Sequence, residues 1–178
     1  GGISPTSTLT SIGKVPSTYN SKGQVIGMPK WTERITTPDE IERWSKNPEL
    51  GICLQTRRIR AIDVDISDID EAEAVYKTLK YPFPVRTRSD SSKFLVLLDC
   101  AGELPKRRFK TKHGVIEFLG TGQQCVLDST HPSGVRYEWP LGWPNTIPVL
   151  TLEQLNELWK VLADQFAIED TVTGSLST

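Results

Sequence analysis

Ile59-Arg-Ala-Ile-Asp-Val-Asp-Ile66 is the stretch of the sequence that decides the fold. Apolar and acidic residues alternate in it, and successive side chains of a β-strand point to opposite faces of a sheet. The stretch therefore predicts a strand with Asp63 and Asp65 on one face and its isoleucines and valine on the other. At about 3.3 Å per residue, the two carboxylates lie about 7 Å apart along the strand.

Helix and strand signals alternate on both sides of this stretch. Thr37-Pro38-Asp39-Glu40 and Thr151-Leu-Glu-Gln154 are capping boxes that predict two helix starts. The apolar spacing of residues 72–79 predicts a third helix, with Ser67 as its cap. Three helices among several strands indicate an α+β (α/β) sheet domain. The expected strands are 51–54, 59–66, 85–88, 94–99, 115–119, 124–128 and 135–139.

Length and charge bound the class of protein. The 178 residues suit one compact unit with its own core. We expect a loop-rich segment over 1–30, a single domain over 31–168 and a frayed tail over 169–178. A formal net charge of −1, from 21 basic and 22 acidic residues, excludes a uniformly basic nucleic-acid binder but allows separate charged regions.

Two further features concern the compartment. No apolar run reaches the roughly 18 residues that a membrane span needs, so we expect no membrane partner. The three cysteines, Cys53, Cys100 and Cys125, show no CxxC spacing, and we expect buried, reduced thiols. Both features favour a cytoplasmic protein.

Acidic residues supply the first candidate site. Burying two carboxylates on one strand face is costly without a partner, and a hard divalent cation such as Mg²⁺ or Mn²⁺ is the natural one. Glu117 is a third acid, alone in the apolar strand 115–119. Three carboxylates from neighbouring strands are what a two-metal phosphoryl-transfer site needs. The alternative is that all three acids lie on a solvent-facing side of the sheet.

Basic and polar residues supply candidate phosphate and nucleic-acid contacts. Ser91 and Lys93 follow a Ser-rich turn and could hold a triphosphate. Arg86 and Arg88 share one face of the preceding strand, and either could contact phosphate. His131 lies in a tight turn before residues 135–139. The basic run 106–112 is either a loop that follows a nucleic-acid backbone or a solvated loop; its candidate contacts are Arg107, Arg108, Lys110 and Lys112.

In this order, the segments resemble the primase-polymerase (prim-pol) domain of the archaeo-eukaryotic primase superfamily, in the versions found in phages, prophages and plasmids. The resemblance spans most of residues 44–139. It is carried by Trp44…Asn47-Pro-Glu-Leu-Gly-Ile52, Ala61-Ile-Asp-Val-Asp-Ile66, Val85-Arg-Thr-Arg88 with Ser92-Lys-Phe-Leu95, Ile116-Glu-Phe-Leu-Gly-Thr-Gly-Gln-Gln124 and His131-Pro-Ser-Gly-Val-Arg-Tyr-Glu-Trp139.

The resemblance implies a fold and a set of site residues. The fold is an RNA-recognition-motif-like sheet joined to a smaller α/β unit, with the active site between these two subdomains. Asp63 and Asp65 match the family's first motif and Glu117 its third, so all three are expected to bind two Mg²⁺ or Mn²⁺ ions. The triphosphate-binding second motif is usually Ser-x-His, and here Ser91-Ser92-Lys93 stands in its place.

The resemblance also implies an activity, which is template-directed nucleotide transfer by a DNA primase/polymerase in phage or mobile-element replication. Its expected partners are single-stranded DNA, nucleoside triphosphates and a fused or separate helicase, and the chain is expected to be a catalytic fragment of a longer protein. Two other classes stay open: a non-catalytic module that binds single-stranded nucleic acid, and a metal-dependent nuclease.

Overall fold

The computed structural model describes residues 16–48 and 50–168, which form two compact units. The first unit comprises residues up to Gln55 together with Gln124–Tyr137, and the second comprises Thr56–Gln123 together with the residues from Glu138 on. The chain therefore passes from one unit to the other three times. The frayed tail expected over 169–178 and the first half of the segment 1–30 lie outside the described residues.

The described residues of the first unit form two small antiparallel sheets and one helix. Strands β1 (Ser17–Tyr19) and β2 (Val25–Gly27) pair with each other, so the expected loop 1–30 includes a hairpin. Helix α1 (Pro38–Ser45) begins at Thr37 with the predicted capping box. Strand β3 (Ile52–Gln55) pairs with β9 (Gln124–Asp128), which follows it by about 70 residues.

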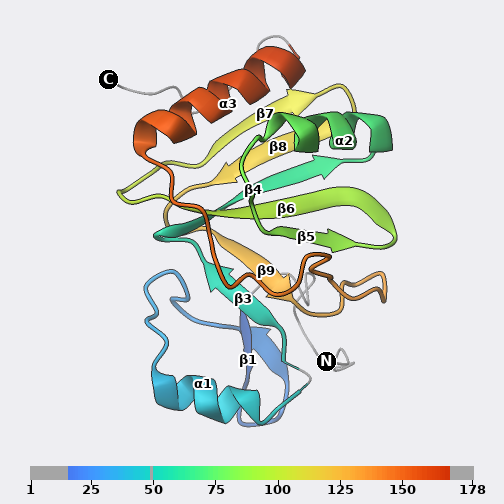
Figure 1. Cartoon of the computed structure of the whole chain (residues 1–178). Coiled ribbons are helices and arrows are strands. Elements are labelled where there is room, and N and C mark those ends of the chain that lie inside the picture. The colour runs from blue at the N-terminus through green and yellow to red at the C-terminus, as the bar shows by residue number, and fades with distance from the viewer. Residues whose placement is uncertain (1–15, 49, 169–178) are drawn as a thin grey trace. The chain divides into compact units, whose positions relative to one another are not determined.

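The second unit is built on a five-stranded antiparallel sheet with the order β5-β6-β4-β8-β7 (Figure 1). Strand β4 (Ile59–Ile66) forms its centre, where the alternating stretch predicted a strand. The other strands are β5 (Val85–Arg88), β6 (Ser91–Asp99), β7 (Arg107–Thr111) and β8 (Gly114–Leu119). Together with the three helices found in residues 16–48 and 50–168, the antiparallel sheets confirm the α+β class.

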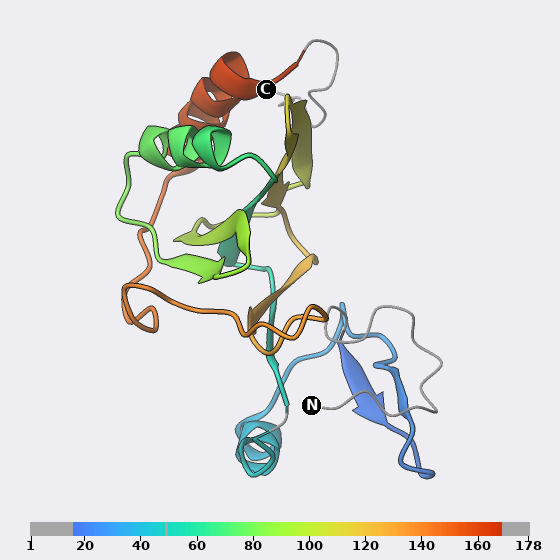
Figure 2. The same ribbon diagram turned by 90° about the vertical axis from the view of Figure 1, so that its right-hand side faces the viewer.

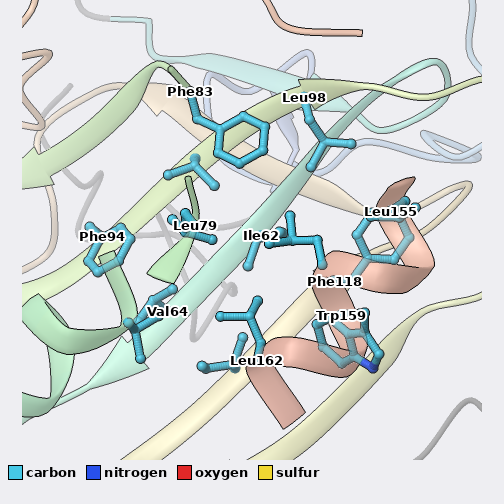
Figure 3. Close-up of a cluster of buried hydrophobic side chains, with 14 of the residues drawn as sticks. Ile62, Val64, Leu79, Phe83, Phe94, Leu98, Phe118, Leu155, Trp159 and Leu162 are labelled. Carbon is cyan, nitrogen blue, oxygen red and sulfur yellow. The ribbon is translucent and has the colours of Figure 1, made fainter. Parts of the chain in front are cut away.

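Helices α2 (Ile69–Thr78) and α3 (Leu152–Phe166) cover one face of this sheet (Figures 1 and 2). Apolar residues of β4, β6 and β8 pack beneath them, and Figure 3 shows Trp159 and Leu162 of α3 close to Ile62 and Phe118 of the sheet. One face of every central strand is thereby buried in the core, and the polar residues that alternate with the core residues are left for the opposite face. None of the described helices combines the length and the apolar character of a membrane span.

Three local predictions were wrong. Asp68 caps α2 because its side chain accepts a hydrogen bond from the Glu71 backbone, whereas the Ser67 hydroxyl donates to the carbonyl of His113. Residues 135–139 form no strand, since Arg136 and Glu138 each make one isolated bridge, to different segments. Cys53 is exposed, because it lies in the exposed first half of β3.

Candidate active site

Strand register aligns charged residues across the sheet, on the face opposite the helices. Asp63 at the centre of β4 pairs with Glu117 of β8, and Glu117 pairs with Arg108 of β7. On the other side, Asp63 pairs with Leu95 of β6, and Leu95 pairs with Arg86 of β5. Directly paired residues point to the same face of a sheet. Two carboxylates therefore lie side by side there, with an arginine on each of the outer strands.

Asp65 lies on the same face, two residues along β4. Its Oδ1 atom is 2.6 Å from the Nζ atom of Lys93 on the neighbouring strand β6, and both side chains are about half exposed. The three acids that the sequence singled out thus share one face, which we call the carboxylate face. The predicted alternation of β4 is confirmed, since Ile62, Val64 and Ile66 are fully buried.

Glu117 is held by two basic residues. Its Oε1 atom is 3.0 Å from the Nζ atom of Lys106 and 3.8 Å from the Nε atom of Arg108. Both partners come from the start of the β7 segment, at the edge of the sheet. The glutamate is therefore neutralised in this structure by groups that could also bind a phosphate.

Asp63 differs from the other two acids. No ion pair or side-chain hydrogen bond within the described part of the chain involves its carboxylate. The pKa of Asp63 is raised to about 6, mainly by burial and also by the charges of Asp65 and Glu117, while Arg86 and Lys106 oppose the rise. Like charges directly opposite each other destabilise a sheet. A cation bound beside Asp63 would offset both the cost of burying its charge and the repulsion from the other two acids.

The carboxylate face has the right ligand atoms for a hard divalent cation, but its side chains are not arranged around a common point. No group of three His, Cys, Asp or Glu side chains within residues 16–48 and 50–168 is arranged as a metal-ligand cluster. Two of the three acids instead point at lysines, namely Asp65 at Lys93 and Glu117 at Lys106. The donor set is nevertheless all carboxylate oxygen, which Mg²⁺ and Mn²⁺ prefer. A cation at either of these two carboxylates would compete with the lysine ammonium group that now contacts it.

The predicted triphosphate residues lie where β5 turns into β6. Strand β6 begins at Ser91 rather than at residue 94. Ser91, Lys93 and Leu95 are spaced two residues apart in it and therefore point to the same face, the carboxylate face. The backbone N–H of Lys93 donates to Oγ of Ser91 at 3.2 Å. Arg88 forms an ion pair with Asp90 of the same turn. These groups adjoin Asp65 through Lys93.

A cavity of about 280 Å³ lies beside the same turn. Tyr76 of α2 and Phe94 of β6 give it apolar walls, Leu141 closes another side, and Ser91 and Lys93 contribute polar groups. Val85 and Phe94 of its lining belong to the core under the helices, so the cavity lies mainly on the helix-covered side of the sheet and is not part of the carboxylate face.

The basic run 106–112 is not the predicted loop, and Arg107 is buried where the prediction needed it exposed to DNA. Residues 107–111 form the edge strand β7, with alternating buried and exposed residues. Arg107 is only 1 % exposed, and its guanidinium carbon lies 5.5 Å from the ring centre of Phe118. Arg108 and Lys110 point outward and Lys112 lies in the turn to β8, so these three stay accessible. The period of two in residues 107–111 was the signal that could have revealed the strand.

His131 lies in a different compact unit from the other candidate residues. It belongs to the first compact unit, whereas all the residues of the carboxylate face belong to the second. Its Nδ1 atom lies 2.9 Å from Oγ of Ser133 and accepts a hydrogen bond from the backbone N–H of Ser133. These contacts explain the tight turn without a ligand.

Comparison with known proteins bears on the whole of this arrangement. A search of curated proteins found no match. The family model described as "Bifunctional DNA primase/polymerase, N-terminal" matches residues 5–157, which include every residue of the carboxylate face. On this match, over far more than half of its length, the chain belongs to the Prim-Pol family of bifunctional DNA primase/polymerase N-terminal domains.

Proposed function

We propose that this chain transfers nucleotides onto a primer under the direction of a DNA template, with Asp63, Asp65 and Glu117 as the ligands of two Mg²⁺ or Mn²⁺ ions. The observation that carries the proposal is the register that sets Asp63 opposite Glu117, with Asp65 on the same face. Membership of the Prim-Pol family supports a primase/polymerase type of role.

The ions would supply Lewis-acid activation of the attacking 3′-hydroxyl group and charge stabilisation of the departing pyrophosphate. The acids would hold them: Asp63 from the centre of the sheet, Asp65 from further along β4 and Glu117 from β8. Asp63 suits this task because no cationic side chain of the described residues pairs with it.

The basic residues would position the substrates. Arg88 at the end of β5 and Ser91 and Lys93 at the start of β6 would bind the triphosphate, since guanidinium, hydroxyl and ammonium groups all donate to phosphate oxygens. Arg86, in register with Leu95 beside Asp63, is a further candidate for the same task.

Template binding is assigned to the edge of the sheet. Arg108, Lys110 and Lys112 are exposed on and next to β7, and cationic side chains along an edge strand can follow a phosphate backbone. Phage or mobile-element replication, with a helicase as partner, is the setting that we propose from the resemblance of the sequence.

The test is extension of a labelled primer on a single-stranded template, with nucleotides and with or without Mn²⁺. Wild type is expected to lengthen the primer only with metal, and Asp63→Asn and Glu117→Gln to lose at least 100-fold in rate, since losing a ligand removes several kcal/mol of charge stabilisation. Asp164→Asn is the matched control, because it removes the same charge from an exposed pair on α3. Shortened DNA would indicate a nuclease, and metal-independent binding without extension would indicate a non-catalytic module.

A further inference from the structure

Lys93 stands between the two halves of the proposed site. Its ammonium group contacts the Asp65 carboxylate at 2.6 Å, although the side chains are 48 % and 58 % exposed. Its backbone N–H is bonded to Ser91, one of the proposed triphosphate ligands. The same side chain thus touches a proposed metal ligand and belongs to the proposed phosphate-binding group.

A metal ion and a triphosphate act on the Lys93 ammonium group in different ways, and both would draw it away from Asp65. A cation on Asp65 repels the Lys93 ammonium, because both are positive and would share one carboxylate. A triphosphate attracts the same ammonium group, because it offers several charged oxygens. The ion pair itself is weakly held, as expected for two half-exposed partners.

Lys106, the other lysine paired with a proposed metal ligand, is not placed in this way. It contacts Glu117 at the opposite edge of the sheet, and Arg108 also lies within 3.8 Å of the same oxygen. If Lys106 leaves, Glu117 keeps a cationic neighbour. Lys93 is therefore the better candidate for a side chain that changes partner when substrate arrives.

We propose that Lys93 exchanges between Asp65 and the triphosphate, so that it covers the metal ligand in the free protein and uncovers it when a nucleotide binds. The proposal rests on the proposed function and adds the order in which the site assembles. Because coupling between two ligands is reciprocal, the metal on Asp65 also releases Lys93 for the nucleotide. The free protein would then bind metal more weakly than its three carboxylates alone predict.

The experiment separates metal from nucleotide, since the two also bind each other in solution. Binding of dATP is measured in EDTA for wild type, Lys93→Gln, Asp65→Asn and the double variant. Asp65→Asn is expected to bind dATP about two- to fivefold more tightly than wild type, the effect of releasing one exposed ion pair. Lys93→Gln is expected to bind dATP more weakly, and in its background Asp65→Asn should bring little further gain. An equal gain in both backgrounds would refute the exchange.

The second measurement is binding of Mn²⁺ alone, followed by electron paramagnetic resonance without nucleotide. Lys93→Gln is expected to bind Mn²⁺ about two- to fivefold more tightly than wild type, because the competing ammonium group is gone. Lys160→Gln is the control, since it removes the same charge from a Lys–Asp pair on α3 and should change nothing. Equal affinity in Lys93→Gln and this control would overturn the exchange alone. If wild type bound neither Mn²⁺ nor dATP, the proposed function would fall with it.

Discussion

Asp63→Asn is expected to stabilise the fold at neutral pH while it destroys the proposed site. The substitution keeps the shape of the side chain and removes a partly buried charge that lies near two other acids. A pKa raised from 3.8 to about 6 means that the ionised carboxyl opposes folding by about 3 kcal/mol once the pH is well above 6. Asparagine carries no such charge, and the Asp63 carboxylate has no described hydrogen bond or ion pair to lose.

The sign of the effect fixes its pH dependence. The folded protein holds the proton of Asp63 more tightly than the unfolded chain does. The free energy of unfolding of wild type therefore falls as the pH rises from about 3.8 through 6. Urea unfolding in EDTA should therefore show a small difference between the variant and wild type near pH 4. The difference should grow to about 3 kcal/mol at pH 8, in favour of the variant.

Metal supplies the complementary half of this measurement. Mn²⁺ at pH 8 should raise the stability of wild type, because a ligand that binds only the folded state stabilises it, and should raise that of Asp63→Asn much less. An asparagine variant that is less stable than wild type at pH 8 without metal, or a difference that does not change with pH, would refute the electrostatic account of Asp63.

Three other outcomes are expected. The double variant Arg108→Gln, Lys110→Gln should bind single-stranded DNA more weakly. The slope of log affinity against log salt concentration should flatten by roughly 0.7 for each phosphate that the protein no longer neutralises. An unchanged slope would remove β7 from the template site. Arg107→Ala should lower the free energy of unfolding in chemical denaturation by about 2 kcal/mol or more, because the buried side chain no longer packs on Phe118. The same salt titrations should show an unchanged slope for this variant. Gly114→Ala should cost about 1–3 kcal/mol in urea unfolding, because a Cβ there would lie 2.0 Å from the backbone oxygen of Asp65, and wild-type stability would show that the two strands can separate freely.

Local patterns predicted much of the fold. The strands 59–66, 85–88 and 124–128 have the predicted bounds, because alternation and flanking turn residues are written within each segment. Both capping boxes are also present as expected, since such a box needs only residues within one turn of helix. The face shared by Asp63 and Asp65 follows from the same local rule.

Features that depend on distant residues could not be predicted in this way. The pairing of Asp63 with Glu117 is a matter of register between β4 and β8, more than 50 residues apart. Arg107 is buried because the Phe118 ring of the neighbouring strand lies under its guanidinium group, and a charged sequence alone suggests a surface loop. The division into two units depends on the pairing of β3 with β9, which no local signal reports.

That division has a consequence for how the chain folds as it is synthesised. Among the described residues, β3 pairs with β9, so this pairing has to wait until residue 128 has been made. All five strands of the larger sheet lie between residues 59 and 119 and so are available before β9. Closing a long loop costs entropy, and this cost falls when the intervening chain is already compact. On the ribosome, the larger sheet is therefore expected to assemble first and to bring the two ends of the smaller unit within reach of each other.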